Sequence, residues 1–293
     1  MFNEKHCTPS NKSEDISCIP LKLLKKIARS LNKYDSDEGK IKLRCSKDEL
    51  HKCISDRIKG MSNCRYENCW ITINIIKNEL LDNEIDLFES SFRPSIPEKW
   101  DENPNEWLST VDINRVMEQY EKAYPNFQYM GANPIDFNKK LRKNKCVSDE
   151  LCKLNIEDIR KKGKKSIGMV FNTDPHDKSG EHWFAVYIDL YGTNIKKKPH
   201  IFHFDSLAKE PKDEIVNFVE DIKNQCGSLN KGKKIDFLFN DIKHQHNNTE
   251  CGVYCLHFLV SMLQGKDFKK YIKNKRSDEQ MEKFRKIFFI PKK

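Results

Sequence analysis

Cys251 stands where the chain changes from polar to apolar, and this position could make its thiol a nucleophile. After Gly252, apolar residues recur at three- and four-residue spacing, which predicts a buried helix capped by Asn248 or Thr249. A thiol in the first turn faces unpaired backbone N–H groups and the positive end of the helix dipole, which favour the thiolate. The alternative is a small buried apolar side chain, which is what we expect of Cys255.

A cysteine nucleophile needs a base, a group that orients the base and donors for the oxyanion, and the sequence offers a candidate for each. His182 begins an apolar run after a polar loop, so its ring can face a cleft while Trp183 shields it from water. Asp205 ends the next strand of a predicted hairpin, where its carboxylate can hold the imidazole of His182. Gln245 could turn its amide N–H toward the same oxyanion as the backbone N–H of Cys251.

Each of these residues also has an ordinary structural interpretation. His182 could decorate a strand end, Asp205 could form a turn, and Gln245 could be a loop residue. Five other histidines of this half are less well placed for the role of base: His176, His200, His203, His244 and His246.

The composition indicates a polar chain that can still build a core. Among 293 residues, 37% are hydrophobic and 33% charged, and 53 Lys+Arg against 44 Asp+Glu give a net charge of +9. The lysines are scattered, which is typical of solvated turns and leaves open only a weak contact with nucleic acid. No apolar run reaches the ~18 residues of a membrane span, and the first residues lack the apolar core of a signal peptide. We therefore expect a soluble protein without membrane contact.

The 11 cysteines are an odd number in a chain too long to need disulfides. We therefore expect a reducing compartment and free thiols. Cys45, Cys53, Cys64 and Cys69 lie near His51 in sequence, but their spacings fit no common zinc pattern. The sequence thus predicts neither a metal nor another cofactor.

The first ninety residues predict helices. Apolar residues at helical spacing run from Pro20 to about Asn32, and Ser46 opens a capping box for a second helix. The period of residues 70–81 fits a helix or a strand, and three prolines make residues 91–106 the best linker. The predicted organisation is a helical arm over residues 1–90 with a loose tail over residues 1–18, the linker over residues 91–106, and a core domain over residues 107–293.

The core domain predicts a small sheet between helices. Runs rich in Ile, Val, Phe and Tyr predict strands at residues 166–172, 183–190, 199–204 and 235–242, the second and third joined as a hairpin. Helices are expected after Ser109, at residues 212–224, after Cys251 and at residues 278–287. This order is typical of an α+β fold.

Taken in order, these segments resemble the ubiquitin-like-protein-specific cysteine proteases, which include the SUMO proteases and the adenovirus protease. Within that family, the chain resembles the polyprotein-processing protease of African swine fever virus. The similarity is good over residues 105–293 and faint before them. The matching segments are Trp107-Leu108, residues 172–183 ending in Gly-Glu-His-Trp, residues 204–206, residues 244–252 ending in Thr-Glu-Cys-Gly, and residues 278–285.

The resemblance implies a papain-like or adenovirus-protease-like core, with a central mixed sheet and flanking helices, and a small helical N-terminal arm. It assigns a catalytic triad to Cys251, His182 and Asp205, the oxyanion hole to Gln245, and substrate contacts to Trp183 and Asn172. The chain departs from the family in two respects. The interval between base and acid is longer than usual, and the acid is Asp where the swine fever enzyme resembles an Asn version.

By the same resemblance, the chain would be a thiol endopeptidase that cuts viral core polyproteins after Gly-Gly, in the virion and the host cytoplasm. A narrow tunnel roofed by Trp183 would exclude residues larger than glycine. Three alternatives stay open. They are a protease that removes ubiquitin-like modifiers, an acyltransferase with the same triad, and a non-catalytic binding module.

Overall fold

The part of the chain that the computed structural model describes comprises residues 6–11, 16–33, 39–195, 198–229 and 234–291. It forms two compact units, one within residues 98–285 and the other built from the chain up to Pro97 together with the residues after 285. The domain boundaries that the sequence suggests, with a linker over residues 91–106, stay a prediction.

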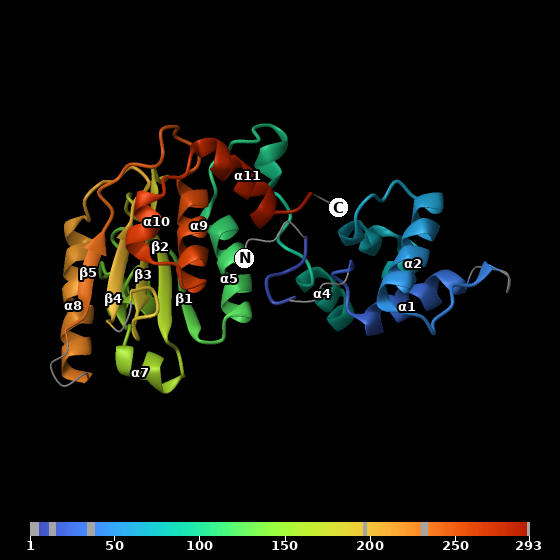
Figure 1. Cartoon of the computed structure of the whole chain (residues 1–293), viewed down its shortest axis with the longest axis horizontal. Helices are drawn as coiled ribbons and strands as arrows, with labels where there is room; N and C mark the ends of the chain where they lie inside the picture. The colour runs from blue at the N-terminus through green and yellow to red at the C-terminus, as the bar shows by residue number, and fades with distance from the viewer. Residues whose placement is uncertain (1–5, 12–15, 34–38, 196–197, 230–233, 292–293) are drawn as a thin grey trace. The chain divides into compact units, whose positions relative to one another are not determined.

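The larger unit is built on a five-stranded mixed sheet. Its strands lie in chain order (Figure 1): β1 (Phe127–Pro134), β2 (Ser166–Asn172), β3 (Trp183–Asp189), β4 (His200–Phe204) and β5 (Asp236–Phe239). The pairs β1–β2 and β4–β5 are parallel, whereas β3 is antiparallel to both of its neighbours. The predicted strands and the hairpin between β3 and β4 are confirmed, with small shifts at their ends.

The sequence did not reveal β1. Gly131 has a φ of 79°, and the pairing register shifts between Tyr129 and Ala132. This bulge interrupts the alternation of apolar and polar residues that identifies a strand in a sequence. Pro134 at its end adds a second signal against a strand.

The helices of the larger unit follow the predicted apolar spacing. A capping box between Ser109 and Asp112 opens the first of them. The helices are α5 (Thr110–Ala123), α6 (Asp149–Cys152), α7 (Ile156–Lys161), α8 (Asp213–Leu229), α9 (Cys251–Leu263), α10 (Phe268–Lys273) and α11 (Asp278–Phe288). Those predicted at α5, α8, α9 and α11 are confirmed.

Helices cover both faces of the sheet, which explains why its central strands are apolar without alternation. All residues of β2, β3 and β4 are buried. On one face, Phe171 of β2 packs against Phe218 of α8. On the other, Phe204 of β4 stacks on Phe258 of α9. The fold is therefore α+β, as the sequence predicted.

The smaller unit is helical. The predicted capping box of Ser46 and Glu49 is present, and residues 70–81 form short helical turns rather than a strand. Its elements are α1 (Leu21–Asn32), α2 (Lys47–Met61), the 3-10 helix η2 (Glu67–Thr72), α3 (Asn74–Lys77) and α4 (Asp82–Ser90). In neither unit does a described helix have the length and apolarity needed to cross a membrane.

The expectation of free thiols is wrong for six cysteines. The structure contains the disulfides Cys7–Cys18, Cys64–Cys69 and Cys146–Cys152. Their partners are 5 to 11 residues apart in sequence, with Cα atoms 5.0 to 6.3 Å apart, which is within the reach of a disulfide. The expectation rested on chain length, which indicates whether a protein needs disulfides to be stable. It does not indicate whether two cysteines lie close enough to form one. The free cysteines are Cys45, Cys53, Cys226, Cys251 and Cys255.

The described part of the predicted loose tail is packed. Cys7 and Cys18 are buried, and the backbone N–H of Thr8 donates to the carbonyl of Ser91. The backbone N–H of Arg93 in turn donates to the carbonyl of His6. These contacts are with residues far along the chain, which explains why periodicity did not predict them.

Gly168 of β2 is a point where an added side chain would disturb the core. A Cβ there would lie 2.7 Å from the ring of Phe127 and 3.3 Å from Leu259, both buried. We expect Gly168→Ala to lower the free energy of unfolding by about 1–3 kcal/mol, the usual cost of overpacking. At the control position Gly227 of α8, nothing lies within 4 Å of an added Cβ, so alanine should stabilise by up to about 1 kcal/mol. Urea unfolding measures both values, and equal effects would contradict this interpretation.

Candidate active site

His182 and Asp205 lie side by side because two antiparallel strands bring them together. His182 immediately precedes β3, Asp205 immediately follows β4, and the pairing of Ala185 with Phe204 sets the register. His182 Nε2 lies 2.8 Å from Asp205 Oδ1, and the two side chains are only 7% and 3% exposed. The hairpin turn lies at the opposite end of both strands, so its length does not affect this contact.

Cys251 completes this group. It is the first residue of α9, which packs against β3. Its side chain interacts electrostatically with the ring of His182, whose pKa it raises, and the residue is 1% exposed. The structure therefore brings together the three residues that we predicted as nucleophile, base and acid.

The environment of His182 favours the protonated ring. Burial alone would lower the pKa of the imidazole, but its interactions with Asp205 and Cys251 outweigh that effect and raise the pKa to about 9. His182 is therefore an imidazolium at neutral pH. A cation between a carboxylate and a cysteine sulfur is suited to a thiolate nucleophile.

A buried asparagine that sequence analysis missed holds Asp205 in place. The side chain of Asn240 accepts the backbone N–H of Asp205 at 2.8 Å and donates to its carbonyl at 2.7 Å. The N–H of Leu207 donates to Asp205 Oδ1 at 2.7 Å. These bonds fix the carboxylate that contacts His182. The only signal in the sequence is a polar residue after an apolar run, which many strand ends share.

Gln245 is buried in the loop before α9, and its amide is partly used. Ser206 Oγ donates to Gln245 Oε1 at 2.6 Å, and Gln245 Nε2 donates to the carbonyl of Asn247 at 2.7 Å. The backbone N–H groups of His244 and Gln245 both donate to the carbonyl of Ser206, which ties this loop to the residue after Asp205. Within the described ranges, only the carbonyl of Asn247 accepts a hydrogen bond from Gln245 Nε2. The second hydrogen of this amide nitrogen can therefore donate to a ligand.

Trp183 is fixed by the segment that precedes α5. Its Nε1 donates to the carbonyl of Leu108 at 3.0 Å. The side chain of Leu108 also lies against Gly252, where an added Cβ would be 3.0 Å away. The glycine after the cysteine therefore makes room for Leu108, which in turn positions the indole.

A cleft of about 460 Å³ opens beside Trp183. Asn172 lines it, as its predicted contact with substrate requires, and Asn172 Oδ1 accepts the N–H of Asp174 at 2.9 Å. Gly180 lies against this amide with a φ of 89°, and a Cβ there would be 2.5 Å from it. The volume is within the range of ligand-binding clefts.

The other histidines do not join this group. Buried His203 is the nearest candidate, but burial lowers its pKa to about 4 despite the charge of Asp205. Each of the others has a structural contact: His176 with the carboxylate of Asp136, His200 with the carbonyl of Lys198, His244 with the carbonyl of Ile272, and His246 through its backbone N–H with Asp278.

The predicted cap of α9 by Asn248 or Thr249 is wrong. The residue before the helix is Glu250, which makes no side-chain cap. Its carboxylate is fully buried and accepts two hydrogen bonds from Nε of Arg285, at 2.9 and 2.8 Å. The capping position is therefore occupied by a residue committed to an ion pair.

Arg285 joins three segments around the site. Its guanidinium donates to the carbonyls of Glu106 at 2.7 Å, Thr249 at 3.1 Å and Asn105 at 3.3 Å, besides its bonds to Glu250. The group also lies 4.6 Å from the ring centroid of Trp100. The residues before Cys251 and those before Leu108 are thus held by one side chain. Its partners are distant in sequence, so sequence analysis could not identify it.

We expect Arg285→Leu to lower the free energy of unfolding by about 3–5 kcal/mol, because it leaves the carboxylate of Glu250 buried and unpaired. Adding Glu250→Gln should recover part of the loss by removing that charge. The control is Lys283→Leu on the same helix, which breaks only an exposed 3.4 Å ion pair with Glu279. Urea unfolding measures all three variants. A loss in Lys283→Leu as large as that in Arg285→Leu would contradict the role given to the buried pair.

Comparison with known proteins identifies the relatives of the chain. A family model described as YopJ Serine/Threonine acetyltransferase matches residues 116–291. The thiol protease of Acanthamoeba polyphaga mimivirus is 28% identical over 293 residues, which is 94% of this chain and 90% of the relative. The SUMO-1 cysteine protease of African swine fever virus (isolate Pig/Kenya/KEN-50/1950) is 26% identical over 241 residues, covering 79% of this chain and 85% of the relative.

The fold agrees with these sequence matches. The crystal structure of the African swine fever virus protease superposes with a TM-score of 0.70 at 19% identity, covering 99% of this chain and 97% of that one. The expected relation to viral cysteine proteases is confirmed. The chain therefore belongs to the YopJ serine/threonine acetyltransferase family, and it is a cysteine-type peptidase related to the thiol proteases of large DNA viruses.

Proposed function

We propose that the chain is an endopeptidase in which Cys251, His182 and Asp205 act as a catalytic triad. The observation that carries this proposal is the imidazole of His182, which lies 2.8 Å from Asp205 Oδ1 and has its pKa raised to about 9 by Asp205 and Cys251. The sulfur of Cys251 attacks the peptide carbonyl, and His182 gives its proton to the leaving amine. Water, deprotonated by His182, then cleaves the thioester. Asp205 orients the ring and stabilises the imidazolium.

The oxyanion of each tetrahedral intermediate is stabilised by two N–H donors. One is the backbone N–H of Cys251, which has no acceptor within its helix because it is the first residue. The other is the second hydrogen of Gln245 Nε2, which Asn247 leaves available. Loss of one such donor typically lowers kcat by about 10²–10³.

We infer that the scissile bond follows a Gly-Gly pair. The support is the fixed indole of Trp183, held by Leu108, at the side of the cleft that Asn172 also lines. In the proposed binding mode, the scissile carbonyl lies beside this indole, which would exclude side chains there and select glycine by size.

The substrates that we propose are core polyproteins of a large DNA virus, cut in the virion and the host cytoplasm during maturation. The viral origin of the related proteases supports this assignment. The name of the swine fever relative, a SUMO-1 cysteine protease, favours a second substrate class of ubiquitin-like modifiers. Incubation with Gly-Gly-X peptides alongside SUMO precursors distinguishes the two by which of them is cut.

A second candidate reaction is acyl transfer, which the description of the family model favours. Both reactions pass through a thioester on Cys251 and differ in the acceptor, which is water for a protease and a serine or threonine hydroxyl for an acetyltransferase. Mass spectrometry after incubation with acetyl-CoA tests this alternative. Acetylation of Cys251 without any peptide cleavage would replace the hydrolytic assignment.

We expect Cys251→Ala to lower the cleavage of a Gly-Gly-X peptide by about 10⁴-fold or more, because the nucleophile is removed. The matched control is Cys53→Ala, which removes an exposed free thiol of the smaller unit and should leave the rate unchanged. A fluorogenic peptide assay measures both rates. Cleavage retained in the Cys251 variant would disprove the proposed nucleophile.

The rate should fall at alkaline pH, because His182 must be protonated and its pKa is about 9. Asp205→Asn weakens the interaction that raises this pKa, so the alkaline limb of kcat/KM should move to lower pH. Because its pKa is raised, protonation of His182 also stabilises the fold. This stabilisation is present in full below pH 6.5, the ordinary pKa of histidine, and is lost once the pH has risen through about 9. The test is to measure kcat/KM against pH for the unchanged protein and for Asp205→Asn. Asp236→Asn, which removes an exposed carboxylate, is the control. An unmoved limb in Asp205→Asn would refute it.

A further inference from the structure

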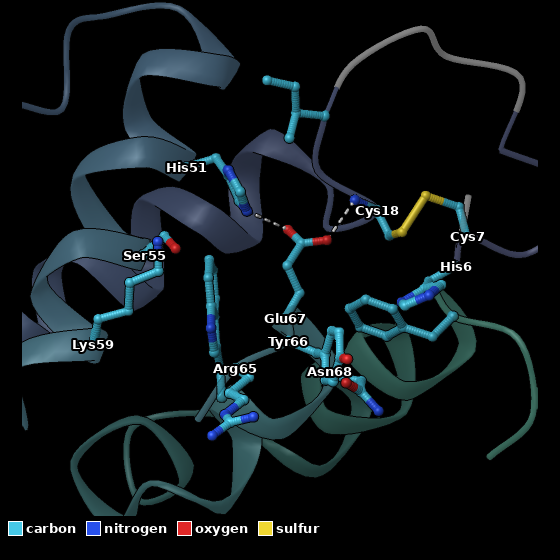
Figure 2. A pocket seen from close by; sticks show the side chains of 13 residues that line it. His6, Cys7, Cys18, His51, Ser55, Lys59, Arg65, Tyr66, Glu67 and Asn68 are labelled. Carbon is cyan, nitrogen blue, oxygen red and sulfur yellow. Dashed lines mark hydrogen bonds and ion pairs between the residues drawn. A yellow bond between two sulfur atoms is a disulfide. The ribbon is translucent and has the colours of Figure 1, made fainter. Parts of the chain in front are cut away.

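A second cavity lies wholly within the smaller unit. Its volume is about 340 Å³, and its lining includes the disulfide Cys7–Cys18, residues of α2 and residues of η2 (Figure 2). It contains charged, aromatic and apolar side chains together. None of the roles proposed for the catalytic group uses these residues.

The acidic side chain of this cavity is saturated by its neighbours. Figure 2 shows the carboxylate of Glu67 between the ring of His51, 3.2 Å away, and the backbone N–H of Cys18, which donates at 2.9 Å. The hydroxyl of Ser17 donates to the same carboxylate. Glu67 is thus hydrogen-bonded to Ser17 and Cys18 beside His51, and no ion pair in the described part of the chain joins Glu67 to Lys59 or Arg65.

The lysine and arginine of the cavity, Lys59 and Arg65, have fewer contacts with groups of opposite charge. Lys59 meets a carboxylate only at 3.9 Å, that of Asp56, and both groups are more than half exposed. No carboxylate in the described part of the chain contacts Arg65.

Lys59 and Arg65 also line a second, more open hollow of about 560 Å³, together with Ser62, Asn63 and Cys64. The two hollows therefore share their cations. The first adds apolar and aromatic groups, whereas the second is polar. A ligand that spans both would meet positive charge between an apolar and a polar part.

Two large apolar side chains stand exposed in the lining of the first hollow. Ile16 is 67% exposed and Tyr66 is 45% exposed. The ring of His51 is stacked on Trp70 beside them. Exposed apolar groups next to exposed cations such as Lys59 and Arg65 are typical of a surface that binds a partner.

The walls are held in position before a ligand arrives. One disulfide joins Cys7 to Cys18, and another joins Cys64 to Cys69 on either side of Arg65, Tyr66 and Glu67. A site whose backbone is already fixed loses less conformational entropy on binding. This favours recognition of a flexible partner.

We propose that these two hollows form a binding site for an acidic stretch of a polypeptide, with carboxylates at Lys59 and Arg65 and an adjacent apolar side chain against Ile16 and Tyr66. A polypeptide fits better than a nucleic acid, because two cations beside apolar and aromatic side chains do not form the long basic track that follows a phosphate backbone. The site is independent of the reaction proposed for Cys251.

The test is fluorescence anisotropy on the full chain with a short fluorescein-labelled peptide that contains Leu-Phe followed by Glu-Asp. We expect saturable binding, weakened about tenfold or more by Lys59→Glu and by Arg65→Glu, since a tenfold change is the effect of one modest charge interaction. A peptide with Gln-Asn in place of Glu-Asp, and one with Ala-Ala in place of Leu-Phe, should each bind more weakly.

The matched control is Lys52→Glu, which makes the same charge change on α2 at an exposed residue outside both hollows. It should bind the peptide like the unchanged protein. Equal weakening by Lys52→Glu, equal binding of the Gln-Asn peptide, or no saturable binding would overturn the proposal. Tighter binding of a single-stranded oligonucleotide, lost in the Lys59 and Arg65 variants, would assign the site to nucleic acid instead.

Discussion

The ion pair between Glu250 and Arg285 is the constraint on which the site depends. A carboxylate buried at the entry to α9 is tolerable only because the guanidinium satisfies it and uses its remaining donors on nearby carbonyls. The same side chain thereby holds the segment that leads to Leu108, whose carbonyl accepts the hydrogen bond of the Trp183 indole. One interaction thus couples the position of Cys251 to the wall of the cleft.

The pairing of β3 with β4 supplies the second constraint. The pairing of two strands can shift only in steps of whole residues. His182 and Asp205 therefore meet in the observed register and would be separated in any other. Asn240 and Ser206 then connect this strand end to β5 and to the loop before α9. The site is therefore rigid, since each reacting side chain rests on backbone that is bonded to another element.

The residues with the strongest chemistry were predictable from sequence because their signals are local. Cys251 marks a change from polar to apolar, and His182 and Asp205 stand at the ends of apolar runs. Arg285 and Asn240 could not be predicted, because what defines them is a partner 35 residues away. The bulge hid β1 for a different reason, since periodicity detects only regular strands. The disulfides depend on proximity in space, which composition does not encode.

The turn of the hairpin between β3 and β4 can change in length without moving His182 or Asp205, because it lies at the other end of both strands. Its turn lies about 20 Å from the reacting groups, as seven residues of strand rise ~3.3 Å each. The long interval between His182 and Asp205 is taken up there. An insertion in this turn leaves the strand register at the other end unchanged, provided that it spares buried Asn194, which donates to the carbonyls of Met262 and Lys266 at 2.8 and 2.9 Å. With that restriction, the turn is a suitable place to attach an epitope or a fluorophore.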